Sequence, residues 1–188
     1  MVLSGGVHKE CTNFDSELRN VKLKIITEGF KFSIKSSVLN KMSIQLDMVK
    51  STFFEDIITG SLALNLYDLI YRDISDIDII IKDSERYANY IKYSAYSETE
   101  NISNLGYKMM AYKKNIFSKS KEFKIDFFKN DEAKFNTFIY RDTELKIQDP
   151  LQIITEKLKI YELSEINGNM SRIKHRSDLF EIFKRINW

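Results

Sequence analysis

The chain has 188 residues and a mass of 22.2 kDa; 43% of its residues are hydrophobic and 30% are charged, which is enough for one globular core. Its 29 basic and 27 acidic side chains give a net charge of +2, which excludes nucleic-acid binding through overall charge alone but not through a local basic face. One cysteine and two histidines exclude a disulfide framework and a zinc site of Cys/His type.

The N-terminal segment and the hydropathy pattern indicate the compartment in which the protein is expected. No stretch reaches the roughly 18 apolar residues that cross a bilayer, and the first 20 residues lack the apolar region of a signal peptide. We therefore expect a cytoplasmic protein with no membrane contact. Residues 1–20 are expected to be a flexible lead-in, residues 21–148 the core, and residues 149–188 a helical C-terminal part packed on that core.

Apolar periodicity predicts alternating strands and helices. In chain order these are two short strands over 21–34, a helix over 36–50, a strand over 56–59, a helix over 62–71, a strand over 76–82, a helix over 85–96, a polar loop over 97–106, paired strands over 107–112 and 123–128, a short edge strand over 145–148, and two helices separated by a polar break at 164–171. Pro150 is expected in the first turn of the first of these two helices. The fold class is α+β, a mixed β-sheet flanked by helices with a helical C-terminal part.

Three aspartates fall on two of the predicted strands. Asp76 and Asp78 are two positions apart, so their side chains leave one face of a strand whose other face is apolar. In the segment FKIDFF, Asp126 lies opposite an apolar Phe/Ile face in the same way. If the two strands are neighbours, three carboxylates converge; they repel one another unless cations lie between them, and their oxygens suit Mg²⁺ or Mn²⁺. We therefore expect a two-metal site for phosphoryl displacement.

Gly60 and Ser61 stand between a predicted strand and a predicted helix. Glycine lets the backbone approach a ligand closely, the N–H groups at a helix start favour phosphate, and Ser61 adds a hydroxyl donor. Opposite the three carboxylates, this turn predicts a binding site for a nucleoside triphosphate.

The order of these motifs resembles the nucleotidyltransferase superfamily of DNA polymerase β type: strand, Gly-Ser, helix, Asp-x-Asp on the next strand, and a single Asp on a later strand. The finer pattern is similar to the branch that contains the AbiEii-type toxins, where an Arg and a small hydroxyl residue, here Arg72 and Ser75, precede the Asp-x-Asp. Further along the chain, Lys157, Lys174 and Asp178 match positions of related proteins. The resemblance covers about residues 54–183.

The resemblance implies a nucleotidyltransferase fold and Mg²⁺-dependent transfer of a nucleoside monophosphate from an NTP to a hydroxyl. The implied catalytic and metal-binding residues are Asp76, Asp78 and Asp126; the implied phosphate-binding residues are Gly60, Ser61 and Lys157; the supporting residues are Arg72, Ser75, Lys174 and Asp178. From the residues alone, Lys157 also fits a surface lysine beside the core face. Arg72 fits either a partner of an acid in the site or a cap of the preceding helix, and Asp178 either a surface acid or a partner that orients a basic neighbour.

The expected acceptor is an RNA, especially a tRNA end, or a protein hydroxyl, and a cognate antitoxin is a further expected partner. Two alternatives stay open. A non-catalytic relative would bind a nucleotide or a partner protein, but the retention of all three acids argues against it. A metal-dependent nuclease would use the same acids and leave Gly60 and Ser61 unexplained.

Overall fold

The computed structural model describes residues 32–74, 76–93, 97–102, 109–118, 121–167 and 171–186. The chain divides into two compact units, residues 1–32 and 33–188, and the fold below belongs to the second. The lead-in expected over 1–20 and most of the strand pair expected over 21–34 lie outside the described residues. Among the described helices, none has the length and apolar character needed to span a membrane.

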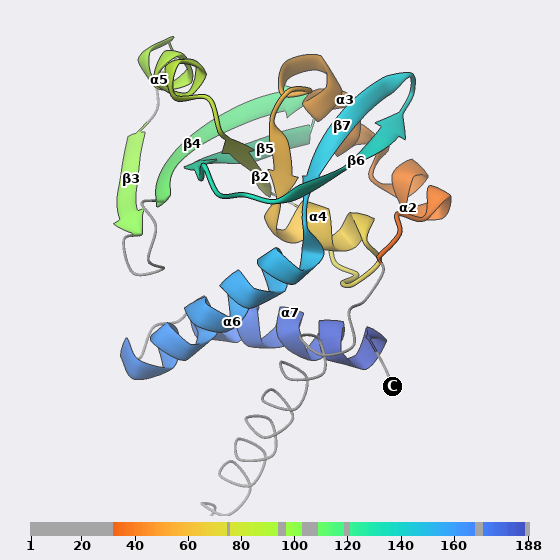
Figure 1. Cartoon of the computed structure of the whole chain (residues 1–188), viewed down its shortest axis with the longest axis vertical. Helices are drawn as coiled ribbons and strands as arrows, with labels where there is room; N and C mark the ends of the chain where they lie inside the picture. Colours follow the sequence, from red (N-terminus) through yellow and green to blue (C-terminus); the bar gives the residue numbers. More distant parts are fainter. Residues whose placement is uncertain are drawn as a thin grey trace, which may run out of the picture. The chain divides into compact units, whose positions relative to one another are not determined.

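Seven strands of the described chain form one mixed sheet in the order β3-β4-β5-β2-β1-β7-β6 (Figure 1). They are β1 (Ile57–Thr59), β2 (Asp76–Ile81), β3 (Ser97–Ile102), β4 (Met109–Ser118), β5 (Lys121–Lys129), β6 (Phe135–Tyr140) and β7 (Thr143–Gln148). In the middle of the sheet β2 runs parallel to β5 and antiparallel to β1, and β1 runs parallel to β7. Segments far apart in the sequence therefore meet at the centre of the sheet.

The helices of the described chain are α2 (Ser36–Lys41), α3 (Ser43–Thr52), α4 (Gly60–Leu66), α5 (Ser84–Tyr93), α6 (Pro150–Asn167) and α7 (Ser171–Arg185). Helix α4 follows β1 directly and packs on β1 and β2, and every residue from Ser61 to Leu66 is buried. Helices α6 and α7 pack against each other, and α6 also contacts α4. The expected α+β class, a mixed sheet flanked by helices, is confirmed.

The central strands bury one face along their length, and their other face carries the aspartates at one end and the buried Ile80 and Phe128 at the other. On β2, Ile77 and Ile79 are fully buried, as is Ile125 on β5. Phe127 of β5 packs edge-on against Phe53 at the end of α3, with ring centroids 5.4 Å apart. Because side chains alternate along a strand, burying this face directs the aspartates of β2 and β5 to the opposite face.

Two strands were not expected. Residues 97–106, expected as a polar loop, contain β3, and residues 135–140 form β6, for which no element was expected. Neither segment alternates apolar and polar residues, and each strand lies at a sheet edge, where it pairs with a neighbour on one side only. The strand expected at the edge over 145–148 is β7, and it is internal because β6 covers its outer side.

Two helices also differ from their expected lengths. The helix expected over 36–50 is two helices, because Met42 interrupts it between α2 and α3. The helix expected over 62–71 ends at Leu66, where Asp68 takes a left-handed conformation (φ 62°) and the Leu69 N–H donates to the Leu64 carbonyl. The chain from residue 70 can then extend towards β2.

Candidate metal centre

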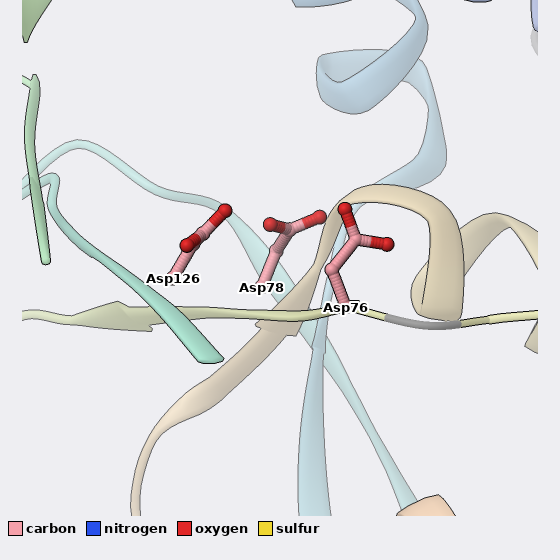
Figure 2. A group of neighbouring side chains, drawn as sticks. All are labelled: Asp76, Asp78 and Asp126. Carbon is pink, nitrogen blue, oxygen red and sulfur yellow. The ribbon is translucent and has the colours of Figure 1, made fainter. Parts of the chain in front are cut away.

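The three predicted carboxylates meet on one side of the sheet. Asp76 and Asp78 rise from β2 and Asp126 rises from β5, all toward the same side (Figure 2). The parallel register sets Asp78 directly opposite Asp126. One carboxylate oxygen from each residue lies within 4.8 Å of those of the other two. The expected convergence of Asp76, Asp78 and Asp126 is confirmed.

The donor set suits a hard divalent cation. Three carboxylates of like charge at this separation repel one another, and a cation between them removes the repulsion. Mg²⁺ and Mn²⁺ prefer carboxylate oxygens, and neither histidine nor cysteine belongs to the cluster. In the described chain, Asp76 Oδ1 and Asp126 Oδ1 are buried side-chain oxygens that accept no hydrogen bond. The residues present therefore fit a metal ion, which Asp76, Asp78 and Asp126 could hold.

Gly60 lies against the carboxylate of Asp78. Its φ of 62° falls in the left-handed region, and a Cβ at this position would lie 1.8 Å from Asp78 Oδ2 and 2.7 Å from Asp78 Cγ. Only a residue without a side chain fits both the conformation and the contact. The turn from β1 into α4 therefore brings backbone directly onto one of the metal-ligand candidates.

A buried ion cluster joins the C-terminal helices to this turn. Asp178 on α7 accepts a hydrogen bond from Lys157 Nζ on α6 at 2.8 Å and from Arg72 Nε at 3.1 Å. The Arg72 guanidinium also donates from Nη2 to the hydroxyl of Ser61, the residue after Gly60. The side chains of Asp178 and Lys157 are 3% and 8% exposed, whereas that of Arg72 is 28% exposed. Arg72 is thus the more accessible of the two cations.

Electrostatics keep Asp178 ionised. Burial alone would raise the pKa of its carboxyl, but the Lys157 ammonium and the Arg72 guanidinium outweigh burial, so the pKa lies below its ordinary value. The carboxylate can therefore hold both cations at neutral pH. The interpretation of Asp178 as the partner that orients a basic neighbour agrees with this geometry.

Among the other predicted site residues, the structure gives side-chain contacts for Lys157 and Arg72 but not for Ser75 and Lys174. Lys157 is not the surface lysine that its place beside the core face suggested, because it is buried and bound to Asp178. Arg72 pairs with an acid rather than capping a helix by itself. Ser75 lies outside the described residues, as does the side chain of Lys174, whose backbone belongs to α7. The structure therefore gives no contact for Ser75 or Lys174.

One buried polar link was not predicted. The Thr59 hydroxyl donates to Gln148 Oε1, and Gln148 Nε2 donates to Glu156 Oε1 on α6 at 3.0 Å. Gln148 is fully buried, so the link ties the end of β1, immediately before Gly60, to β7 and α6. The sequence carries no signal for it, because a single glutamine at a strand end is equally common on a surface.

Comparison with protein-family models, curated proteins and solved structures finds no match to this chain.

Proposed function

We propose that this chain is a divalent-cation-dependent nucleotidyltransferase that moves a nucleoside monophosphate from a nucleoside triphosphate to a hydroxyl group. The observation that carries the proposal is the convergence of Asp76, Asp78 and Asp126 next to the side-chain-free turn at Gly60. The same residues carry the sequence resemblance to the nucleotidyltransferase superfamily and its AbiEii-like branch. Bound Mg²⁺ or Mn²⁺ would neutralise the triphosphate and align it for in-line attack.

The transfer exchanges one bond at the α-phosphorus for another. The acceptor oxygen forms a bond to the α-phosphorus, the bond from that phosphorus to the α,β-bridging oxygen breaks, and pyrophosphate leaves. The attacking hydroxyl must lose a proton, and we assign its acceptance to Asp126, which lies on β5 across from Asp78. Asp76 and Asp78 then remain as ligands on the triphosphate side. In this assignment β5 supplies the carboxylate on the acceptor side of the reacting phosphate, and β2 supplies the two on the triphosphate side.

We assign the side-chain contact with the phosphates to Arg72 rather than to Lys157. Asp178 neutralises one of its two cationic partners, so the cluster keeps one positive charge. Lys157 is buried and its ammonium is bound to Asp178, whereas the Arg72 guanidinium is partly exposed beside Ser61. A planar guanidinium also matches two phosphate oxygens at once. Lys157 then acts indirectly, by fixing Asp178 and through it Arg72.

The proposal is tested by a transfer screen. The full chain is incubated with each α-labelled NTP, Mg²⁺ or Mn²⁺, and either total RNA, purified tRNA or a protein mixture that includes the chain itself. We expect the α-label on one acceptor class together with release of unlabelled pyrophosphate, and no labelled acceptor with Asp76→Ala. Asp73→Asn, an exposed acid on the approach to β2, is the matched control and should transfer normally.

Each other outcome contradicts the proposal. Tight NTP binding without transfer to any acceptor would favour a non-catalytic nucleotide-binding protein. RNA cleavage without NTP, lost in Asp76→Ala, would favour a metal-dependent nuclease. Transfer that persists in a folded Asp76→Ala variant would exclude the carboxylate cluster as the active site. The identity of the labelled acceptor also decides between RNA and protein, and a cognate antitoxin is expected to reduce the label.

A further inference from the structure

Strand β6 (Phe135–Tyr140) is an open edge of the sheet. It pairs with β7 over six consecutive residues without a register shift, and in the described chain no strand pairs with its other side (Figure 1). Its sequence FNTFIY contains no charged residue and no proline. Backbone N–H and C=O groups along such an edge are a template for another strand.

The opposite edge of the sheet is different. Strand β3 carries Glu98 and Glu100 in the sequence SETENI, and its pairing with β4 shifts register between Thr99 and Ile102. Charged residues and irregular pairing are two devices by which proteins prevent strand addition at an edge. The edge at β3 therefore has both features that prevent strand addition, and the edge at β6 has neither.

The outward face of β6 is apolar and exposed. Phe135 is 41% exposed and Ile139 is 63% exposed, with Thr137, also exposed, between them. These three residues share one face because side chains two positions apart on a strand point the same way, and their cross-strand neighbours on β7 are Gln148, Lys146 and Glu144. The side chains of an added strand would lie beside these two apolar side chains and bury part of their surface.

We propose that β6 pairs antiparallel with β6 of a second copy of this chain, across a two-fold axis at Thr137. This register is self-complementary on the exposed face: Phe135 lies opposite Ile139 of the second copy, Thr137 lies opposite its own equivalent, and Ile139 lies opposite Phe135 of the second copy. Aromatic–β-branched and Thr–Thr pairs are favourable cross-strand neighbours. A two-fold axis is also the usual symmetry of a homodimer.

Charge complementarity favours a second copy over an unrelated strand. Lys82 Nζ and Lys146 Nζ lie 5.8 Å and 5.6 Å from the Phe135 ring centroid. Glu144 is the β7 partner of Ile139 and is exposed. In the proposed register, Ile139 of the second copy lies opposite Phe135, and Glu144 of that copy is the next residue across the sheet. Its carboxylate is therefore on the same sheet face as the two ammonium groups beside Phe135 and attracts them across the axis. The arrangement occurs twice, once on each side of the axis.

The dimer is independent of the proposed function. Strands β1 and β7 lie between β6 and β2, so pairing at β6 leaves Asp76 and Asp78 uncovered. Six paired residues a side give a small interface, and we therefore expect a reversible dimer whose population depends on protein concentration.

Cysteine cross-linking tests the register directly. Residues opposite each other in an antiparallel pair have Cα atoms about 4.5–5.5 Å apart, within the range for a disulfide. In a Cys11→Ser background of the full chain, Thr137→Cys should form a disulfide-linked dimer under mild oxidation. Asn40→Cys, at an exposed position of α2, should remain monomeric at the same protein concentration. Equal cross-linking at the two positions would overturn the proposal.

Sedimentation velocity over a range of concentrations supplies the second measurement. The unmodified chain should show a growing dimer fraction, and Thr137→Lys and Ile139→Lys should each abolish it. Both variants should keep the circular dichroism of the unmodified chain and its melting temperature at dilutions where that chain is monomeric. Asn40→Lys, with the same added charge, should dimerise normally. A chain that stays monomeric throughout overturns the proposal and leaves the edge to a strand of a different protein. A dimer that persists in both β6 variants belongs to another surface and overturns it as well.

Discussion

The carboxylate of Asp78 occupies the space that a side chain at position 60 would need: a Cβ built on Gly60 would lie 1.8 Å from Asp78 Oδ2. The contact joins two features that the sequence shows separately, the Gly-Ser turn and the Asp-x-Asp strand. It arises because β1 and β2 are antiparallel neighbours, with Thr59 opposite Asp78, so the residue after β1 passes over that carboxylate.

Gly60→Ala should damage both stability and the candidate metal site. The left-handed conformation alone costs roughly 1–2 kcal/mol for a residue with a Cβ, and the methyl group must also displace the Asp78 carboxylate. We expect a lower free energy of unfolding in urea and at least tenfold weaker Mn²⁺ binding by calorimetry. In an Asp78→Ala background the stability cost of Gly60→Ala should shrink, since the clashing carboxylate is gone; equal costs in both backgrounds would contradict this account.

Asp126→Asn should separate metal binding from folding. Removing one of three converging charges relieves their repulsion, so the metal-free variant should melt at the same temperature as the unmodified chain or higher. The unmodified chain should be stabilised by added Mn²⁺ through mass action, and the variant should not. Thermal melts with EDTA and with Mn²⁺ measure both effects, with Asp73→Asn as the control that keeps the response.

Substitutions of Asp178 and of Lys157 should lower the free energy of unfolding by different amounts. Asp178→Asn leaves the buried Lys157 ammonium without its carboxylate, and breaking a buried ion pair from one side costs about 3–5 kcal/mol. Lys157→Met should cost less, because Asp178 keeps Arg72 as a partner. Urea unfolding of both variants measures the order, and a larger loss in Lys157→Met would show that Arg72 does not compensate.

The contribution of Asp178 to the free energy of unfolding should decrease as the pH is lowered. Its pKa in the folded chain lies below the ordinary value of 3.8, so between these two values the unfolded chain binds more protons and stability rises with pH. The difference in unfolding free energy between the unmodified chain and Asp178→Asn should be constant above about pH 5 and shrink as the pH falls further. Urea titrations from pH 3 to pH 7 test this; a difference that grows on acidification contradicts the assigned sign.

Arg72→Lys should raise the KM for NTP more than it lowers kcat, because a lysine keeps the charge but loses the two-oxygen contact and the link to Ser61. Arg141→Lys, at an exposed arginine paired with Asp47, is the control and should leave both constants unchanged. Steady-state transfer kinetics on folded variants distinguish this result from a purely structural role, which would reduce the amount of active protein without moving KM.

The candidate site could be predicted largely from local pattern. The alternation around Asp76 and Asp126 gave both the strands and the face on which the carboxylates lie, because a buried apolar face determines where the other face points. That β2 and β5 are adjacent was a conditional expectation, and the register between Asp78 and Asp126 confirms it.

Long-range polar contacts and edge strands could not be predicted in this way. Lys157 has the spacing of a residue beside the core face, and only the approach of α7 shows that Asp178 lies there to bind it. Strand β6 lacks alternation because its residues have no buried face of their own for most of their length, and its existence depends on β7. Such features are set by tertiary neighbours rather than by sequence periodicity.

The insertion of β7 beside β1 has a kinetic consequence. Ile57 pairs with Lys146, so the middle of the sheet closes only when segments far apart in the sequence meet. Closing so long a loop loses conformational entropy before the strand contacts form. Such pairing between distant segments gives a high contact order, which slows folding. During synthesis, β1 and its neighbour β2 would leave the ribosome long before β7 exists, so we expect the nascent domain to stay unfolded until β7 has emerged.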